Sequence, residues 1–229
     1  MVASPLTTDQ LRAFPLFESL AEGDLEHLLE RHLTSALTED QLLVQERDWG
    51  ETLFLIRAGM AKVRCFSPEG EEVVLCLLGP GDVFGEMALL DEQPRSADVL
   101  SLTPLNLVKF SGALFRQLML NRPALALAIA KLQSKRLRDL NRRFAIHSAD
   151  AATRLLNALA QLACLSGAGG GVLSPFPAIA QRELAAIAGL SRETTSRTLS
   201  KLRQRGYLEE SEGELRLVSA EPLKRRCLL

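Results

Sequence analysis

Apolar and polar positions follow different periods in successive parts of the chain. Over residues 9–33, leucines recur at three- to five-residue spacing with acidic residues between them, which predicts helix. From about residue 36 to 110, short apolar runs alternate with turn residues such as Gly79-Pro80-Gly81-Asp82. Short strands at regular spacing with glycine turns are typical of an all-β sandwich or barrel. The first half of the chain is therefore predicted to be a β-rich unit that follows N-terminal helices.

A long helix is predicted next, beginning near Pro123 and ending at about residue 147. It carries a seam of positions spaced by four and three residues, which is a heptad-like pattern. The seam positions are Ala126, Ala130, Gln133, Leu137, Leu140 and Phe144. We interpret this seam as the contact of a homodimer, because the helix is long and stands between two domains. One amphipathic helix packed on its own domain is the alternative interpretation.

The last part of the chain is predicted to be a smaller helical domain with a hairpin. Residues 151–165 predict a helix, and the glycine-rich segment 166–171 predicts a flexible break. Two more helices are expected at about 181–188 and 192–205, before a hairpin formed by 207–210 and 214–218. We thus expect a β-rich domain with N-terminal helices over 1–111, a long helix over 112–147 and a C-terminal domain over 148–229.

The composition is that of an ordinary globular protein, with 47% apolar and 24% charged residues. No run of ~18 or more apolar residues predicts a membrane span, and the first residues lack the pattern of a secretory signal. The cysteines have no CxxC spacing, which argues against a disulfide framework, a zinc site or an iron–sulfur cluster. Free thiols fit the reducing cytoplasm, where we expect the protein to lie. The cysteines are Cys65, Cys76, Cys164 and Cys227.

Charge is distributed unevenly along the chain, although the net charge is only −1. Residues 148–229 hold 11 Lys and Arg against 8 Asp and Glu, and the rest of the chain holds 16 against 20. Within residues 180–206 there are six basic and two acidic residues. A concentration of basic charge near one motif is the footprint expected of a DNA-binding segment.

The segment from Glu183 to Leu208 has the pattern of a helix-turn-helix. Gly189 permits the tight turn, and Ser191 caps the second helix. Such a helix fits the major groove of DNA, where arginine pairs with guanine and glutamate with cytosine. A helix-turn-helix used only for packing is the alternative. The side chains expected to contact DNA are Ser191, Arg192, Glu193, Thr194, Ser196, Arg197 and Lys201, with Thr198 and Ser200 as further phosphate contacts.

A second motif, FGEMALLDEQPRSADV over residues 84–99, predicts a pocket for an anion. Gly85 and Glu86 open a short apolar helix, whose first backbone N–H groups suit an anion. Arg95 lies nine residues further on and can pair with the same anion. Glu86 suits a sugar hydroxyl better than a bare phosphate, so the motif fits a ribose phosphate with one negative charge. The alternative interpretation is that Arg95 and Glu86 form an ion pair with a structural role only. The residues assigned to this site are Gly85, Glu86, Met87, Ala88, Arg95 and Ser96.

At these two motifs the chain resembles the cyclic-AMP receptor protein/FNR (CRP/FNR) superfamily of bacterial regulators. LFLIRAGMAKV and GDVFGEMALLDEQPRSADV are similar to its cyclic-nucleotide β-roll, and RELAAIAGLSRETTSRTLSKL is similar to its helix-turn-helix. The resemblance extends from Leu11 to Val218. It implies an α+β fold with an N-terminal cyclic-nucleotide-binding β-roll (jelly roll), a long dimerisation helix and a C-terminal winged helix-turn-helix.

The same resemblance implies a transcription regulator and not an enzyme. It implies that cAMP or a related cyclic nucleotide binds in the roll, with Glu86 on the ribose 2′-hydroxyl and Arg95 and Ser96 on the cyclic phosphate. Three side chains, Arg192, Glu193 and Arg197, would read the bases of TGTGA-type half-sites in an inverted repeat of double-stranded DNA. A second copy of the chain and RNA polymerase are the implied protein partners.

One position departs from the family pattern. Nucleotide-responsive members usually place Thr, followed by Ser or Asn, on the long helix to hold the adenine, and this chain has Leu140 and Asn141 there. A missing partner for a buried polar edge costs about 1–3 kcal/mol, which is roughly tenfold to a hundredfold in affinity. We therefore expect a weakened or altered nucleotide response, with Asn141 as the remaining contact to the base. A regulator that is active without an effector is the alternative.

Other classes of protein fit the sequence less well. The N-terminus lacks the cysteine cluster of oxygen sensors, and none of the histidines that haem sensing would need lies in a predicted strand (His27, His32 and His147). An enzyme on a cupin-like barrel would need His and carboxylate metal ligands clustered on strands. We therefore expect no metal, haem or iron–sulfur cluster. A cyclic-nucleotide-binding regulatory subunit that acts on a protein partner stays as the alternative from a different class.

Overall fold

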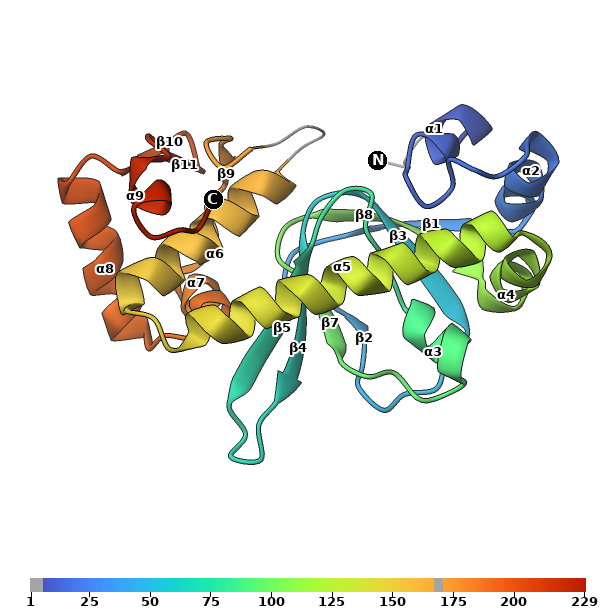
Figure 1. Cartoon of the computed structure of the whole chain (residues 1–229), viewed down its shortest axis with the longest axis horizontal. Helices are drawn as coiled ribbons and strands as arrows, with labels where there is room; N and C mark the ends of the chain where they lie inside the picture. The colour runs from blue at the N-terminus through green and yellow to red at the C-terminus, as the bar shows by residue number, and fades with distance from the viewer. Residues whose placement is uncertain (1–5, 167–170) are drawn as a thin grey trace.

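The computed structural model describes residues 6–166 and 171–229 of the chain. This description leaves out residues 1–5 and 167–170. The first segment belongs to the N-terminus that was predicted to lack a secretory signal, and the second is most of the predicted glycine-rich break. The described chain forms a larger N-terminal lobe (residues 6–121) and a smaller C-terminal lobe (residues 148–229), joined by one long helix (Figure 1).

Two short helices open the N-terminal lobe, α1 (Thr8–Arg12) and α2 (Glu22–Glu30). Thr7 caps α1 in a capping box with Gln10, so the start of this helix is determined by local sequence. The periodic leucines of this region, including Leu11, lie in one apolar cluster with residues of the β-rich unit. The N-terminal helices are therefore part of the lobe's core.

Two antiparallel sheets of four strands form a β-roll, in the orders β1-β8-β3-β6 and β2-β7-β4-β5. Successive residues of β3 face opposite sides, as the pleat requires. Leu53 and Leu55 pack in the cluster with the N-terminal helices, and Phe54 and Ile56 pack in the cluster that joins the two sheets. The strands are β1 (Leu33–Leu37), β2 (Leu42–Val44), β3 (Thr52–Ala58), β4 (Ala61–Phe66), β5 (Glu72–Leu78), β6 (Val83–Phe84), β7 (Asp98–Ser101) and β8 (Leu105–Ser111).

One short helix, α3 (Glu86–Asp91), lies within the motif of residues 84–99, and two helices follow the last strand of the roll, α4 (Gly112–Asn121) and α5 (Pro123–His147). The helical path breaks at Arg122, and Pro123 starts α5 at a position where its missing N–H costs nothing. The first turns of α5 bury Leu125 and Ile129 in the N-terminal lobe, and its last turns reach the C-terminal lobe (Figure 1). With 25 residues, α5 is about 38 Å long at 1.5 Å per residue.

The C-terminal lobe packs helices against a small sheet in the order β10-β11-β9. Its first helix, α6 (Ala151–Leu165), begins at Asp150, whose carboxylate accepts a hydrogen bond from the Thr153 N–H at 2.8 Å. The hairpin and the helices before it form a winged helix-turn-helix, so the predicted α+β fold class is confirmed. The other elements are β9 (Phe176–Pro177), α7 (Gln181–Ala188), α8 (Arg192–Gln204), β10 (Leu208–Ser211), β11 (Glu214–Leu217) and α9 (Glu221–Lys224).

The two lobes contact each other directly in addition to being joined by α5. Met60, Val74 and Leu102 of the N-terminal lobe lie in the same apolar cluster as the helices of the C-terminal lobe. Gly79 is a point of close approach, because a Cβ at this position would lie 2.9 Å from Leu165 Cδ2. The orientation of the C-terminal lobe is therefore determined by packing against the roll.

Candidate ligand pocket and nucleic-acid interface

The candidate ligand pocket is built on a left-handed turn at Gly85, between β6 and α3. Gly85 has φ +85°, and a Cβ there would lie 2.5 Å from Arg95 Nη1 and 2.7 Å from the Thr52 carbonyl oxygen. Only glycine fits both the backbone conformation and the close approach of the arginine. We call Gly85, Glu86 and Arg95 the cradle.

Arg95 is the cation of the cradle and is only 7% exposed. Its guanidinium donates to the Gly85 carbonyl at 2.7 Å and to the Thr52 carbonyl at 2.8 Å, and it lies 5.9 Å from the centre of the Phe54 ring. Burial lowers the pKa of Arg95, and the nearby Glu86 charge opposes that shift. Among the described residues no carboxylate forms an ion pair with Arg95, so its positive charge remains available to an anion.

Glu86 is the buried carboxylate of the cradle, with 2% exposure. Its Oε1 accepts hydrogen bonds from Gln133 Nε2 at 2.7 Å and from Arg136 Nη1. Arg136 also donates to the Val83 carbonyl through Nη2. Glu86 is thus engaged by α5 and not by Arg95, and the alternative of a structural Arg95–Glu86 ion pair is wrong for this arrangement.

Sequence reasoning missed Arg136 and assigned Gln133 to the dimer seam. Both side chains project from α5 and bind Glu86 of their own chain. They can do so together because residues three apart in a helix lie on the same face. The signal that could have found them is their helical spacing from Ile129, which is buried in the N-terminal lobe. A long helix beside a roll presents one face to that roll, and this face includes positions 129, 133 and 136.

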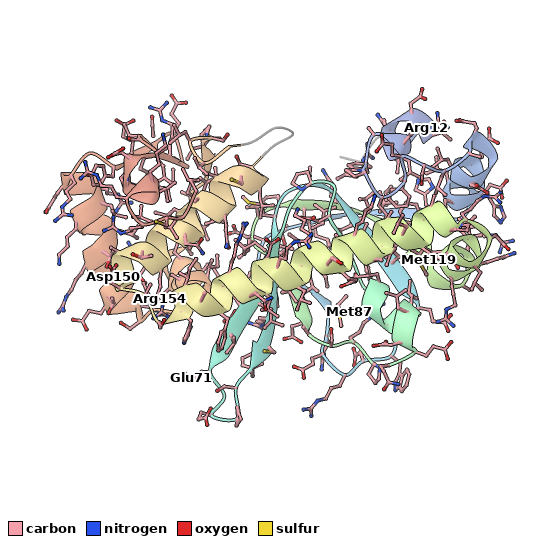
Figure 2. The ribbon with its side chains drawn as sticks, viewed as in Figure 1. Arg12, Glu71, Met87, Met119, Asp150 and Arg154 are labelled. Atoms are coloured by element: carbon pink, nitrogen blue, oxygen red, sulfur yellow. The ribbon has the colours of Figure 1, made fainter. Side chains whose placement is uncertain are left out.

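The other residues assigned to the ligand site lie near the cradle with one exception. Met87 lies on α3, below the middle of α5 (Figure 2), and its sulfur is 3.6 Å from Ser96 Oγ. Ala88 is half-buried in the same helix. Asn141 is exposed on α5 and lies about 12 Å along the helix axis beyond Gln133. A single chain therefore does not bring Asn141 to the cradle.

The inner wall of the roll beside the cradle is apolar. The rings of Phe54 and Phe84 stack with centroids 4.7 Å apart, in the cluster that joins the two sheets. Cys76 packs against this cluster, and burial raises the pKa of its thiol to about 11, an effect that the charge of Arg136 opposes. Cys76 is therefore a neutral thiol at physiological pH and a small polar group in the wall, which the sequence pattern did not indicate.

The helix-turn-helix consists of α7, a turn at Gly189 and α8. Gly189 has φ +61°, and Ser191 Oγ accepts a hydrogen bond from the Thr194 N–H at 3.1 Å, so the predicted turn and cap are both present. Arg154 lies near Asp150 at the start of α6 (Figure 2) and donates to the Ala188 carbonyl at 3.0 Å. Arg143 of α5 donates to the Ile187 carbonyl. Two arginines thus hold the end of α7 in place.

The face of α8 that was predicted to contact DNA is mostly open. Arg197 pairs with Glu193 at 2.5 Å, and their side chains are 73% and 72% exposed, so this pair exchanges easily for another partner. Thr198 is the exception among the predicted phosphate contacts, because it is buried and its hydroxyl donates to the Thr194 carbonyl at 2.7 Å. The other predicted residues are exposed (Ser191, Arg192, Lys201 and Ser200) or half-buried (Thr194 and Ser196).

In residues 6–166 and 171–229, no group of three or more His, Cys, Asp or Glu side chains could hold a metal ion. No helix in the same range has the length and apolar content needed to cross a membrane.

A β-roll with a charged cradle, joined by a long helix to a winged helix-turn-helix, defines a two-domain DNA-binding regulator. Residues 35–122 match the family described as Cyclic nucleotide-binding domain, and residues 153–226 match the Crp-like helix-turn-helix domain. The chain therefore belongs to the CRP/FNR family of transcription regulators, as its motifs predict.

Individual relatives agree with this assignment. The Cyclic AMP receptor protein of Thermus thermophilus is 34% identical over 221 residues, which cover 93% of this chain and 97% of that protein. The CRP-like cAMP-activated global transcriptional regulator of Mycobacterium tuberculosis is 32% identical over 185 residues, 80% of this chain and 82% of that protein. The structure of FixK2 from Bradyrhizobium japonicum has a TM-score of 0.74 at 17% identity over 85% of this chain and 96% of that chain, which supports the fold alone. The two relatives identified by sequence are a cyclic AMP receptor protein and a transcriptional regulator of bacteria, and not enzymes, as predicted.

Proposed function

We propose that this chain is a homodimeric, sequence-specific transcription regulator whose DNA binding is controlled by a cyclic nucleotide in the roll. The observation that carries the ligand proposal is the buried guanidinium of Arg95, held by two backbone carbonyls and without a carboxylate partner in the described chain. A buried cation without a counter-ion is costly, and an anion that fills the site relieves that cost. The similarity to proteins named for cAMP makes cAMP the first nucleotide to test.

The cradle suits a cyclic phosphate next to a sugar. Arg95, aided by the Ser96 hydroxyl, would bind the single negative charge of the phosphate. Both hydrogen bonds that Glu86 accepts from α5 end on Oε1, so Oε2 is the oxygen left for the ribose 2′-hydroxyl. Ligand binding would thereby act on the same carboxylate that Gln133 and Arg136 hold, and so on the position of α5.

The second copy of the chain would cover the seam of α5. Leu137, Leu140 and Phe144 are 60%, 45% and 83% exposed in the single chain, and Ala130 is exposed beside them. Large apolar side chains in a row at heptad-like spacing are stabilised by a parallel partner helix. Dimerisation through this seam would present two copies of α8, about one helical turn of DNA apart.

Three side chains at the start of α8 are the proposed base readers. Arg192, Glu193 and Arg197 are exposed on one face and would enter the major groove at a TGTGA-type half-site. An inverted repeat of two half-sites matches the two-fold symmetry of a dimer. A regulator of this kind acts on the bacterial chromosome in the cytoplasm and works through RNA polymerase.

Leu140 and Asn141 leave a second version of this function open. Without the hydroxyl that usually precedes Asn141, adenine recognition would be weak, and the apolar Leu140 would favour the dimer seam without ligand. In this version the protein binds DNA constitutively and the cradle is vestigial. The two versions differ in whether a cyclic nucleotide binds and changes DNA affinity.

Calorimetry with cAMP and cGMP tests the ligand. We expect micromolar binding of cAMP that is at least a hundredfold weaker in Arg95→Gln. Arg12→Gln is the control, because Arg12 lies on the N-terminal helices (Figure 2), where it pairs with Glu22. Absence of binding of either nucleotide to the wild-type protein would contradict the ligand proposal and favour the constitutive version.

Selection of bound duplexes from random DNA, with and without cAMP, tests the DNA-binding function. We expect an inverted repeat with TGTGA-type half-sites to be enriched. Enrichment that depends on cAMP supports nucleotide control, and equal enrichment without it supports the constitutive version. If no sequence is enriched in either condition, a regulatory subunit that acts on a protein partner becomes the better explanation.

A further inference from the structure

Lys62 of β4 is a buried cation at the contact between the two lobes, with 2% exposure. Its neighbours in the strand, Ala61 and Val63, pack in the cluster inside the roll. Because side chains alternate along a strand, Lys62 faces outward from the roll. The outward face of β4 at this point is covered by the C-terminal lobe.

The ammonium of Lys62 joins the two lobes through two carboxylates. It donates to Glu72 Oε1 of β5 at 2.5 Å and to Glu183 in the first turn of α7. The side chains of Lys62, Glu72 and Glu183 are 3%, 26% and 15% exposed. The ammonium is the most buried of the three charges, so removing it would leave two partly buried carboxylates without their cation.

A second contact engages the neighbouring residue of α7. Arg182 pairs with Asp40 of the N-terminal lobe at 2.6 Å and with Glu183 at 3.3 Å. The positive Arg182 thus pairs with a carboxylate of the roll, and the negative Glu183 beside it pairs with a lysine of the roll. We call Lys62, Glu72, Asp40, Arg182 and Glu183 the interlobe latch.

The place of the latch on α7 gives it a consequence for DNA binding. In a helix-turn-helix, the first helix crosses the DNA backbone while the second enters the groove, and helix N-termini contact phosphates. The first turn of α7 is here engaged by the roll, since Asp40 pairs with Arg182, and Lys62, which Glu72 also holds, pairs with Glu183. Phosphates approaching this turn would meet carboxylates and an arginine that already has a partner.

We propose that the interlobe latch is an autoinhibitory contact, which holds the C-terminal lobe on the roll in an arrangement that binds DNA weakly. This proposal rests on the proposed DNA-binding function of the helix-turn-helix. The latch restricts α7 and leaves the reading face of α8 open, so it acts on where α8 can be placed. Release of α7 from the roll relieves the inhibition.

A chain of charges connects the latch to the strand that follows the cradle. Glu72 also lies 3.5 Å from Arg64, and Arg64 pairs with Asp98 of β7 at 3.3 Å. Asp98 comes three residues after Arg95 in the sequence. A ligand that moves the Arg95 turn therefore moves one end of an ion-pair chain whose other end is α7.

The test measures DNA affinity of the full-length protein without any nucleotide, on an inverted-repeat duplex that the wild-type protein selects. Lys62→Met keeps the length of the side chain but leaves Glu72 and Glu183 without their cation, which favours the released arrangement. General electrostatics predicts weaker DNA binding after loss of a positive charge. The latch predicts the opposite sign, an increase in affinity of at least fivefold, and Lys62→Arg should restore wild-type affinity.

Asp40→Asn is a second variant that keeps the protein folded, because Asp40 is exposed and asparagine tolerates its positive φ of 61°. We expect an increase of two- to fivefold. Asp24→Asn is the matched control, since Asp24 pairs with Arg122 within the N-terminal region and has no role between the lobes. Its affinity should stay within twofold of the wild type.

Unchanged or weaker DNA binding by both Lys62→Met and Asp40→Asn, with circular dichroism and oligomeric state as in the wild type, overturns the latch. An increase in the two latch variants but not in Asp24→Asn supports it, whether or not cAMP binds. If neither the wild-type protein nor the latch variants bind DNA, the proposed function fails and the latch is overturned with it, because there is no activity for it to inhibit. DNA binding by the latch variants alone, with none by the wild type, supports the latch.

Discussion

Arg136 links α5 to the cradle, and its replacement by methionine tests that link. Arg136→Met keeps most of the aliphatic stem but removes the hydrogen bonds to Glu86 and to the Val83 carbonyl. Hydrogen bonds to charged groups contribute about 1.5–3 kcal/mol each. The Arg136 side chain is 24% exposed, and Gln133 stays on Glu86, so water and Gln133 replace part of both bonds and the net loss is about that of one bond. We expect the free energy of unfolding to fall by about 2 kcal/mol.

Urea unfolding followed by circular dichroism measures this loss as a lower midpoint with an unchanged slope. In a thermal melt the same loss lowers Tm by about 4–8 °C for a chain of this size. Arg138→Met is the matched control, because Arg138 is exposed on the same helix and the change in charge is identical. It should change stability by less than about 0.5 kcal/mol.

Nucleotide binding gives the same substitution a second readout. Without Arg136 the Glu86 carboxylate loses its cation and repels an incoming phosphate more strongly, so cAMP should bind about tenfold more weakly. If Arg136→Met unfolds like Arg138→Met and binds cAMP like the wild type, the ion pair with Glu86 has no energetic role. The inference that α5 is controlled through the cradle would then be refuted.

Three other predictions concern the dimer, the DNA and pH. Phe144→Glu should convert the dimer to monomers in analytical ultracentrifugation. Leu120→Glu is the control and should leave the dimer intact, because Leu120 is similarly exposed but lies on α4. A dimer that survives Phe144→Glu would contradict the assignment of Phe144 to the dimer contact. Arg192→Ala should relax the preference for one guanine at a cost of about 1–3 kcal/mol in competition binding, and unchanged base preferences would rule out its reading role. The hydrogen bond from the Thr153 N–H holds the pKa of Asp150 below its usual value, so its stabilisation is present at neutral pH and is lost as pH falls through that lowered pKa. Asp150→Ala should cost about 1 kcal/mol at neutral pH in urea unfolding, and a difference from wild type that persists below the lowered pKa would contradict this.

Local signals predicted the parts of both sites that depend on neighbouring residues. The turn at Gly189 and the cap at Ser191 lie where the sequence places them, because φ and hydrogen bonding there involve residues two or three positions apart. The short helix after Gly85 was also predicted, but the left-handed conformation of Gly85 was not. The period of the apolar positions predicted the strands of the first half and the helices after them, because it reports the faces of these elements. The α+β fold class itself was implied by the family resemblance.

Features that join distant segments were not predictable in this way. Arg136 reaches Glu86 across 50 positions, and Lys62 reaches Glu183 across 121. In the sequence, Lys62 is a polar residue in an alternating strand, and such a residue normally faces water. Gln133 fitted the heptad spacing of the seam, and only the packing of α5 on the roll turns its amide toward Glu86.

The number of residues in α5 between Arg136 and Arg143 limits which insertions and deletions the protein can accept. Arg136 binds the cradle region, and Arg143, seven residues later, binds the end of α7. Seven residues are about two turns at 3.6 residues per turn, so both arginines project from the same side of the helix. A single inserted residue between them would rotate one arginine by about 100° relative to the other and separate the pocket from the DNA-reading motif. The segment between the two arginines therefore has a fixed length, whichever side chains it carries.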